Sequence, residues 1–447
     1  MSNINDFVIE NGVLKKYTGS GGDVVIPESV TSIGASAFWG CSSLTSVVIP
    51  ESVTSIGDWA FEGCKGLADA NGFVIIQNAL HDYYGKGGDV VIPEGVTSIG
   101  ASAFWECSSL ASVVIPEGVT SIGDKAFWGC SSLTSVVIPK GVTGIGDSVF
   151  FNCSSLASVV IPESVTSIGD WAFRGCIGLR SVVIPEGVTS INYRAFEGCK
   201  GLASVVIPDG VTSIGHSAFE GCSSLTSVVI PESVTSIGAS AFSGCSSLAS
   251  IVIPESVKSI GNEAFWGCKG LASVVIPKGV TCIGWKAFAG CSSLTSVVIP
   301  KGVKSINYRA FEGCSSLTSV VIPASVTSIG NWTFEGCCGL KPENAPSISV
   351  SVFSAMRLGI QAGYGFLSAR ERFTNPEIAG GYLKYCISQR KKILPLIFRD
   401  DNDEALRFYI DEKKVTAKNF DTDYFVPALQ AGAEKCKALL LEWKEQH

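Results

Sequence analysis

The feature that most constrains the fold is a proline that returns every 23 residues. It follows an apolar triplet, and the step is 23 residues everywhere except between Pro50 and Pro93, where it is 43. A fixed period of this length is typical of a solenoid, in which each repeat buries the apolar face of its neighbour. We therefore expect a stack of similar repeats, here called rungs, over most of the chain. The prolines are Pro27, Pro50, Pro93, Pro116, Pro139, Pro162, Pro185, Pro208, Pro231, Pro254, Pro277, Pro300 and Pro323.

Each rung follows the pattern L-x-x-V-x-I-P-x-x-V-x-x-I-x-x-x-A-F-x-x-C. The piece L-x-x-V-x-I alternates as a half-buried strand should, and proline ends it because proline has no N–H for the ladder. The piece V-x-x-I-G predicts a second short extended segment, and A-F-x-x-C predicts a single helical turn that returns the chain. One phenylalanine per rung, from Phe38, Phe61 and Phe104 onward to Phe334, is expected to stack as an internal spine.

The long step between Pro50 and Pro93 contains a second copy of the N-terminal sequence. Residues 73–93 match residues 7–27 in length and pattern, and both predict a strand, a turn, a second strand and a glycine-rich bend. The N-terminal copy is expected to cap an open sheet edge that would otherwise invite pairing with another chain. The predicted parts are an N-terminal capping hairpin (1–27), first repeats (28–70), an inner hairpin unit (71–93), a leucine-rich repeat array (94–340) and a helical C-terminal cap (341–447).

After residue 340 the repeat pattern stops. KPENAPS at 341–347 has the composition of a linker, whereas residues 404–414 and 433–446 show the apolar spacing of amphipathic helices. The sequence therefore predicts a small α-helical region at the C-terminal end of the repeats.

The repeat pattern resembles the BspA-like class of leucine-rich repeats, which also occurs in treponemal repeat proteins, and the resemblance covers residues 7–340. It implies a solenoid that forms a β-rich, right-handed superhelix with a parallel sheet. It also implies a non-enzymatic role in adhesion to host matrix proteins or other microbes at a cell surface, with no catalytic residue and no cofactor. The N-terminus shows no secretory signal, so a cytoplasmic location is the alternative if that absence is genuine.

Residues 428–442 resemble the helix pair of an ankyrin repeat, because Ala-x-x-x-Gly precedes L-L-L-E. The segment FYID at 408–411 stands 31 residues before LLLE at 439–442, close to the ankyrin period. This resemblance implies an ankyrin-like character for the C-terminal helices.

Charge and hydropathy exclude two classes of partner. The net charge of −7 gives no electrostatic footprint for nucleic acid. No apolar run approaches the roughly 20 residues that span a bilayer, so no transmembrane segment is expected. The expected partner is a protein, or a glycan, that binds along the repeat surface.

Thirteen of the 17 cysteines form a ladder with one member in each rung, from Cys41 to Cys337. A metal ion needs several ligands at one point, and a ladder supplies one per rung, so we predict small buried residues and no metal site. Outside the ladder, Cys386 and Cys436 lie on helix candidates. They are either nucleophiles of an effector domain or core residues, and their apolar neighbours favour the core.

Specificity is expected where the rungs differ, around the Ala-Phe pair. Trp105, Trp128 and Phe151 occupy one position in three successive rungs, so they should form a continuous aromatic strip, with Trp171 and Tyr193 beside it. These five residues are the predicted binding residues, since large aromatics beside charge are common interface anchors. The alternative is that they only stabilise contacts between rungs.

The middle residue of each V-V-I triplet is valine in every rung, from Val25 to Val321. This valine stripe is either a docking surface or a consequence of strand propensity. The leading hypothesis for the whole chain is a non-enzymatic binding or adhesion scaffold. The alternatives are an intracellular effector whose repeats select a target for the helical domain, and a plain structural spacer.

Overall fold

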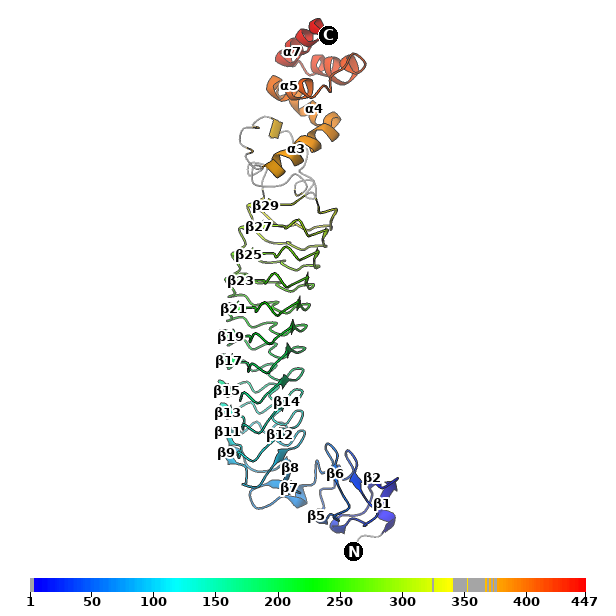
Figure 1. The fold of residues 1–447 in the computed structure, drawn as a ribbon, viewed down its shortest axis with the longest axis vertical. Coiled ribbons are helices and arrows are strands. Elements are labelled where there is room, and N and C mark those ends of the chain that lie inside the picture. Colours follow the sequence, from blue (N-terminus) through cyan, green and yellow to red (C-terminus); the bar gives the residue numbers. More distant parts are fainter. Residues whose placement is uncertain are drawn as a thin grey trace. The chain divides into compact units, whose positions relative to one another are not determined.

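The computed structural model describes residues 4–323, 325–340, 352, 366–367, 370, 373 and 376–447. The linker predicted at 341–347 lies outside these residues. The chain divides into two compact units, Met1–Leu248 and Ala249–His447, whose elements are labelled in Figure 1. Among the described helices, none combines the length and the apolar character needed to cross a membrane.

Every rung contributes one strand to each of two parallel ladders, called here the long face and the short face. On the long face, Ser135, Val136 and Val137 of one rung pair with Ser158, Val159 and Val160 of the next. On the short face, each strand has two residues, and Ser190–Ile191 pairs with Ser213–Ile214. The register advances by one period at each step, so equivalent residues lie in columns. This confirms the predicted parallel-sheet solenoid.

Proline ends each long-face strand and begins a turn. The carbonyl of Pro27 accepts the N–H of Val30 at 3.0 Å, and the same bond follows the later prolines. Proline therefore both ends the strand and sets the bend that leads to the short face.

The strands of the first unit fall into three groups. The two hairpins are β1 (Phe7–Glu10) with β2 (Val13–Tyr17) and β7 (Phe73–Ile76) with β8 (Ala79–Tyr83). The long face has β3 (Gly22–Val25), β5 (Leu44–Val48), β9 (Gly88–Val91), β11 (Leu110–Val114), β13 (Ser135–Val137), β15 (Ser158–Val160), β17 (Ser181–Val183), β19 (Ser204–Val206) and β21 (Ser227–Val229). The short face has β4 (Ser32–Ile33), β6 (Ser55–Ile56), β10 (Ser98–Ile99), β12 (Ser121–Ile122), β14 (Gly144–Ile145), β16 (Ser167–Ile168), β18 (Ser190–Ile191), β20 (Ser213–Ile214) and β22 (Ser236–Ile237). Two short 3₁₀ turns, η1 (Ile4–Asp6) and η2 (Lys65–Leu67), complete the unit.

Each hairpin begins its own short-face sheet. Strand β2 pairs antiparallel with β1 and parallel with β4, and β8 pairs in the same way with β7 and β10. The resulting sheets have the orders β1-β2-β4-β6 and β12-β10-β8-β7, so β6 is the last strand of the first. The chain thus starts a second array at β7, and Figure 1 shows β6 and β7 where the two arrays meet.

A spine of fully buried phenylalanines fills the interior. The rings of Phe173 and Phe196 lie 5.3 Å apart and nearly parallel, and neighbouring pairs repeat this geometry. At the start of each array a hairpin tyrosine extends the stack, with Tyr17 at 5.2 Å from Phe38 and Tyr83 at 5.0 Å from Phe104. The predicted spine is confirmed within each array, but the second hairpin interrupts it, because Phe61 contacts His81 and Phe104 contacts Tyr83.

The predicted helical turn at A-F-x-x-C is wrong. The residue two before each phenylalanine has a positive φ, which side chains other than glycine adopt rarely. Because this residue is in the left-handed conformation, the backbone N–H groups of every second residue, counted from this one, point toward the next rung. Ser36 donates to Asp58 O, Phe38 to Ala60 O and Gly40 to Glu62 O, at 2.8–3.0 Å. A helical turn would direct these donors along its own axis instead. This part of each rung is called the turn side.

The ladder cysteines lie beneath the turn side, as predicted for small buried residues. The structure adds a contact that was not predicted: the Sγ of Cys130 donates to the carbonyl of Phe104 in the preceding rung, at 3.1 Å, and later cysteines repeat the bond. Cys41 and Cys107 stand first in their arrays and are only half-buried, since a hairpin rather than a complete rung precedes them.

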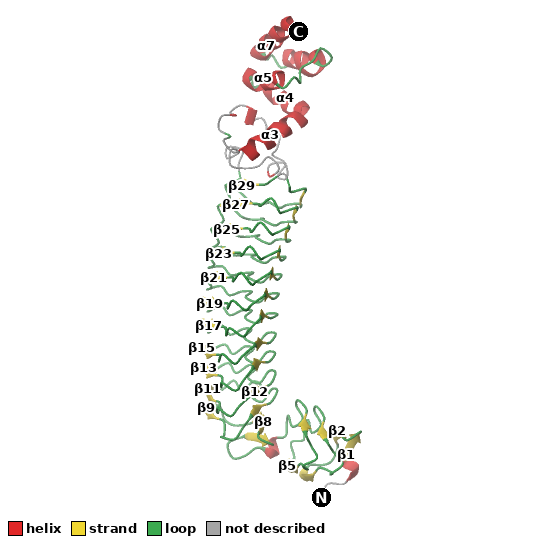
Figure 2. Ribbon diagram, viewed as in Figure 1, coloured by secondary structure: helices red, strands yellow, loops and turns green. Residues whose placement is uncertain are grey.

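The second unit carries the last rungs and the helices, which Figure 2 shows in red. Tyr409 donates its hydroxyl to the carbonyl of Cys386 in another helix at 3.1 Å, and Asn402 caps the helix that carries Tyr409 by accepting the N–H of Ala405. The predicted C-terminal helical region is confirmed. Its strands are β23 (Ser250–Val252), β25 (Ser273–Val275), β27 (Ser296–Val298), β29 (Ser319–Val321), β24 (Ser259–Ile260), β26 (Cys282–Ile283), β28 (Ser305–Ile306) and β30 (Ser328–Ile329). Its helices are α3 (Pro376–Ser388), α4 (Arg390–Arg399), α5 (Asp403–Asp411), the π-helical η5 (Phe420–Phe425), α6 (Val426–Gln430) and α7 (Glu434–Gln446).

Candidate functional site: an aromatic strip on the turn side

The predicted residues Trp105, Trp128 and Phe151 each follow a spine phenylalanine. In this part of the turn side, the N–H of Glu106 donates to Trp128 O at 2.7 Å and that of Gly129 to Phe151 O at 2.8 Å. These backbone bonds hold successive rungs at ladder spacing. Because the adjacent phenylalanine points inward, the residue after it projects outward, and three such side chains form one column.

The three rings stack on one another. Trp105 and Trp128 have ring centroids 4.9 Å apart, and Trp128 and Phe151 have centroids 3.7 Å apart, with interplanar angles of 5° and 7°. Trp105 is exposed, and the other two are half-buried. The column therefore presents a continuous edge of aromatic surface to solvent and is called here the aromatic strip.

Cationic side chains flank the aromatic strip. The Nζ of Lys125 lies 5.7 Å from the ring centroid of Trp105 and 5.9 Å from that of Trp128. At the other end, the guanidinium of Arg174 lies 5.1 Å over Phe151 and pairs with Glu197 at 2.9 Å. Both contacts are cation–π interactions, which hold a long charged side chain against an aromatic face.

A groove opens where the aromatic strip ends. Its volume is 560 Å³, and its lining includes Phe151, Arg174, Glu197, Lys200 and the exposed Ile177. An apolar side chain and charges of both signs therefore lie within reach of a partner that covers the strip.

Trp171 and Tyr193, the other two predicted residues, do not extend the stack. Their rings meet edge to face at 5.1 Å, and both are half-buried. Arg194 lies 4.9 Å over Tyr193 and also contacts Glu197 at 3.4 Å. They form a second aromatic pair, which is linked to the aromatic strip through Glu197, since Glu197 pairs with both Arg174 and Arg194.

Trp59, Lys125 and Arg174 are not among the five predicted binding residues, although Trp59 occupies one of the variable positions around the Ala-Phe pair. Trp59 belongs to the first array, yet its ring also lies 5.9 Å from Lys125 Nζ, and its Nε1 donates to Ser102 Oγ at 3.1 Å. The 43-residue step between Trp59 and Ser102 hid this contact. The Phe-x column itself contained the signal for Arg174, which takes the next place after Phe151.

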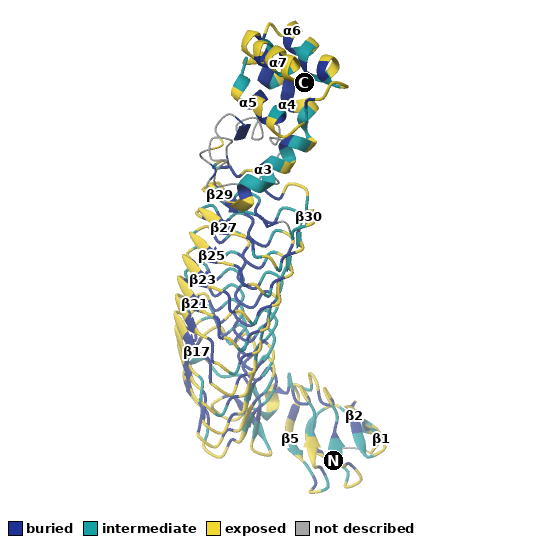
Figure 3. Cartoon of the chain, turned by 45° about the horizontal axis from the view of Figure 1, so that its top comes forward, coloured by how far each residue is buried: buried dark blue, intermediate teal, exposed yellow. Residues whose placement is uncertain are grey.

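The valine stripe faces solvent, as Figure 3 shows by the exposed long-face strands. Val229 is 77% exposed, whereas its neighbours Val228 and Ile230 are 5% exposed. In the second unit, Val275 and Val298 line a groove of 730 Å³ beside Lys278 and Lys301. The stripe is accessible, and its uniform chemistry offers little to distinguish one partner from another.

Two of the four cysteines outside the ladder, Cys386 and Cys436, lie in the helical core. Cys386 and Cys436 are fully buried, and burial raises the pKa of each thiol to about 12. A thiol of this kind stays protonated at neutral pH and is a poor nucleophile. In the described part of the chain, no three His, Cys, Asp or Glu residues converge as metal ligands would.

We expect the native protein to react with Ellman's reagent in one fast phase that arises from Cys338. This cysteine is exposed, whereas burial raises the pKa of ladder thiols such as Cys153 to about 12. The substitution Cys338→Ser should remove the fast phase, and the fully buried ladder thiols should react only after unfolding in urea. Equal reactivity of all the thiols in the native state would contradict the buried ladder.

The repeats match a known family model. The model of the BspA type leucine rich repeat region (6 copies) matches residues 9–78, 74–203, 143–272, 189–315 and 260–358. A search of the curated proteins found no match.

Solved bacterial structures resemble the chain. A leucine-rich repeat protein from Bacteroides ovatus is 31% identical, with a TM-score of 0.51, over 76% of this chain and 91% of that one. A leucine rich cell surface protein from Faecalibacterium prausnitzii is also 31% identical, with a TM-score of 0.41 and the same coverage. A leucine-rich repeat protein from Eubacterium ventriosum is 26% identical, with a TM-score of 0.40, over 58% of this chain and 88% of that one. With its repeat pattern, its parallel ladders and this family match, the chain belongs to the BspA-type leucine-rich repeat family.

Proposed function

We propose that the chain is a non-enzymatic adhesion scaffold that binds a protein partner along the turn side of its first unit. The observation that carries the proposal is the stacking of Trp105, Trp128 and Phe151 into one accessible column. Interfaces concentrate their binding energy in a few aromatic and arginine side chains that a partner can desolvate. The aromatic strip offers such anchors on a backbone held by inter-rung hydrogen bonds, so little ordering is needed on binding.

The charges around the strip support a protein partner. Lys125 and Arg174 lie over the aromatic faces, so the strip presents ring edges and cations together. The groove beside Phe151 adds Ile177 and Lys200. Such a mixture of aromatic, apolar and charged groups is typical of the core and rim of protein interfaces. The resemblance to adhesion proteins agrees with this use of the surface.

The two alternatives receive less support. The effector hypothesis needs a reactive group in the C-terminal helices, and burial keeps Cys386 and Cys436 protonated there. The spacer hypothesis explains the uniform valine stripe but not the clustering of aromatics on three successive rungs. The ankyrin-like character of residues 428–442 stays a prediction, since the family match ends at residue 358 and α6 has only five residues.

The double substitution Trp105→Ala with Trp128→Ala tests the proposal. We expect the native chain to bind at least one matrix protein among immobilised collagen, fibronectin and laminin, measured by surface plasmon resonance. We expect the double variant to bind at least about 30-fold more weakly, because each hot-spot aromatic contributes about 2 kcal/mol or more. The circular-dichroism spectrum should remain unchanged.

Trp39→Ala is the matched control. Trp39 occupies the same column in the first rung and is 67% exposed, but no described aromatic ring stacks on it. It should retain full binding. An equal loss in the control, or no binding to any of the three matrix proteins, would contradict the proposal. Unfolding of the double variant would instead show that the strip is structural.

A further inference from the structure

The junction between the two arrays lacks one rung of the turn-side ladder. Within an array, the residue two positions after a spine phenylalanine, usually glycine, donates its N–H to the next rung, as Gly40 does to Glu62 O. At the junction, Gly63 donates instead to Oδ2 of Asp82, at 3.1 Å. Asp82 belongs to hairpin strand β8 and also accepts the hydroxyl of Tyr84. The hairpin thus replaces the missing carbonyl with a carboxylate, but it does not supply every donor that a following rung would supply.

Asp58 is one group that this difference affects. At the equivalent position of later rungs, the side chain accepts a backbone N–H from the next rung: Asp124 from Asp147, and Asn262 from Trp285, at 2.8 and 2.9 Å. Among the described residues, the Asp58 carboxylate accepts no hydrogen bond, because the hairpin stands where the next rung would supply the donor. Its two oxygens remain available to a ligand.

His81 lies in the hairpin itself, on β8, and is the second polar group at the junction whose side chain has an unused hydrogen-bonding atom. It takes the place that Lys15 has in the N-terminal hairpin, and its ring contacts Phe61 edge to face at 5.4 Å. Its buried Nε2 has no hydrogen-bond partner in the described part of the chain. A buried nitrogen of this kind is costly unless a ligand or water satisfies it. Burial also lowers the pKa of His81 to about 4, so the ring is neutral at physiological pH.

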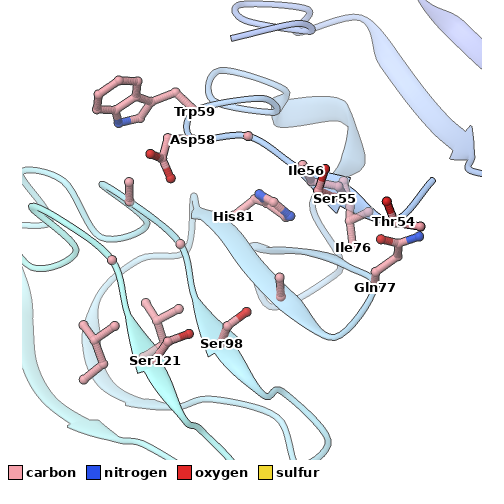
Figure 4. A pocket seen from close by; sticks show the side chains of 17 residues that line it. Thr54, Ser55, Ile56, Asp58, Trp59, Ile76, Gln77, His81, Ser98 and Ser121 are labelled. Carbon is pink, nitrogen blue, oxygen red and sulfur yellow. The ribbon is translucent and has the colours of Figure 1, made fainter. Parts of the chain in front are cut away.

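These two groups line one pocket of 380 Å³ inside the first unit. Figure 4 shows Asp58 and Trp59 on one side, Ser98 and Ser121 on the other, and His81 between them. The indole of Trp59 is held at the rim by its hydrogen bond to Ser102. The volume is in the range of small-ligand sites, which combine an apolar wall with a few placed polar groups.

We propose that this pocket binds one neutral sugar unit of a glycan. A pyranose ring has an apolar C–H face that can pack on the Trp59 indole and hydroxyls that suit the opposite wall. The carboxylate of Asp58 would accept two sugar hydroxyls, His81 Nε2 would exchange a hydrogen bond with a third, and Ser98 and Ser121 can donate or accept. The inference goes beyond the protein partner of the aromatic strip and does not depend on it.

A cationic ligand fits the pocket less well. Asp58 is the single charged residue of the lining, which would by itself attract an amine. However, Lys125 holds its ammonium 5.9 Å from the Trp59 ring and would repel a second cation placed at that ring. A neutral polyol avoids this repulsion, and its hydroxyls can form hydrogen bonds with Ser98 and Ser121 of the pocket wall.

Saturation-transfer NMR on the full chain tests the proposal. The probes are the methyl glycosides of glucose, galactose, mannose and N-acetylglucosamine, with methylguanidinium as the cationic probe. We expect at least one glycoside to receive saturation, and Asp58→Asn to weaken its binding at least about tenfold, because it replaces a charged acceptor. His81→Phe should weaken it as well, while preserving the contact with Phe61.

Asp124→Asn is the matched control, because Asn262 already makes the same backbone hydrogen bond in its own rung. It should leave glycoside binding unchanged. Saturation of methylguanidinium alone, no saturation of any glycoside, or full binding by Asp58→Asn would each overturn the proposal.

Discussion

Replacing Phe196 with alanine is expected to lower the free energy of unfolding by about 3–5 kcal/mol. Phe196 is fully buried, and its ring stacks on Phe173 at 5.3 Å and on Phe219 at 5.4 Å. The substitution removes the side chain that joins two neighbouring rungs and leaves a cavity that the hydrogen-bonded ladders prevent from closing. Urea unfolding followed by far-UV circular dichroism measures the effect.

The control for this prediction is Val206→Ala, on the long face of the same region. Val206 is 61% exposed, so its truncation should change the stability by no more than about 0.5 kcal/mol. Similar losses in the two variants would mean that the spine is not the main source of rung stability. Because rungs couple mainly to their neighbours, hydrogen exchange should show the largest loss of protection in the rungs that flank Phe196.

His81 is expected to produce the second large effect, a loss of folding stability at acidic pH. Burial lowers the pKa of His81 from 6.5 to about 4. Between these two pH values the ring is therefore protonated in the unfolded chain and neutral in the folded chain. Stability is therefore lost as the pH falls from about 6.5 to about 4, and the loss amounts to about 3 kcal/mol for this group. Below pH 4 the folded ring is protonated too, and its contribution no longer changes.

The variant His81→Phe isolates this contribution, because phenylalanine keeps the ring contact and cannot titrate. The stability of the wild type minus that of the variant should decrease between pH 6.5 and pH 4. The two proteins must be compared because the neighbouring Asp82 also titrates. Burial raises the pKa of Asp82, so its protonation stabilises the folded state as the pH falls and would partly mask the effect of His81 in the wild type alone. A constant difference across this range would show that His81 is accessible to solvent protons.

The repetitive parts of the fold could be predicted from the sequence with little error. Alternation in L-x-x-V-x-I identifies a strand, and the 23-residue period places equivalent residues in columns, so the stacking of Phe173 on Phe196 required no further information. The error at A-F-x-x-C has a physical cause. Short apolar segments look alike in a helical turn and in a chain of left-handed turns, and residues such as Trp171 and Arg194 rarely adopt a positive φ outside a constraining ladder.

Part of the candidate site could likewise be predicted from the sequence, and part of it could not. That Trp105, Trp128 and Phe151 share a column follows from their spacing, whereas Trp59 joins them only because the second array restarts beside the first. Trp59 and Lys125 each stand two residues before a spine phenylalanine, but the pattern does not say whether rungs on the two sides of the hairpin come into contact.

The sequence by itself determined the structure of the rung, its buried face and the family. Each 23-residue copy carries apolar side chains at the same positions, so each copy buries them in the same way. Only the tertiary structure decided which polar groups have partners. Asp58 has the same neighbours along the chain as aspartates that hold the next rung, yet in the described part of the chain its carboxylate accepts no hydrogen bond, because a hairpin takes that rung's place. Whether a polar group has a hydrogen-bond partner depends on the residues that pack against it from the next rung. The repeat pattern in the sequence does not show where a hairpin takes the place of that rung.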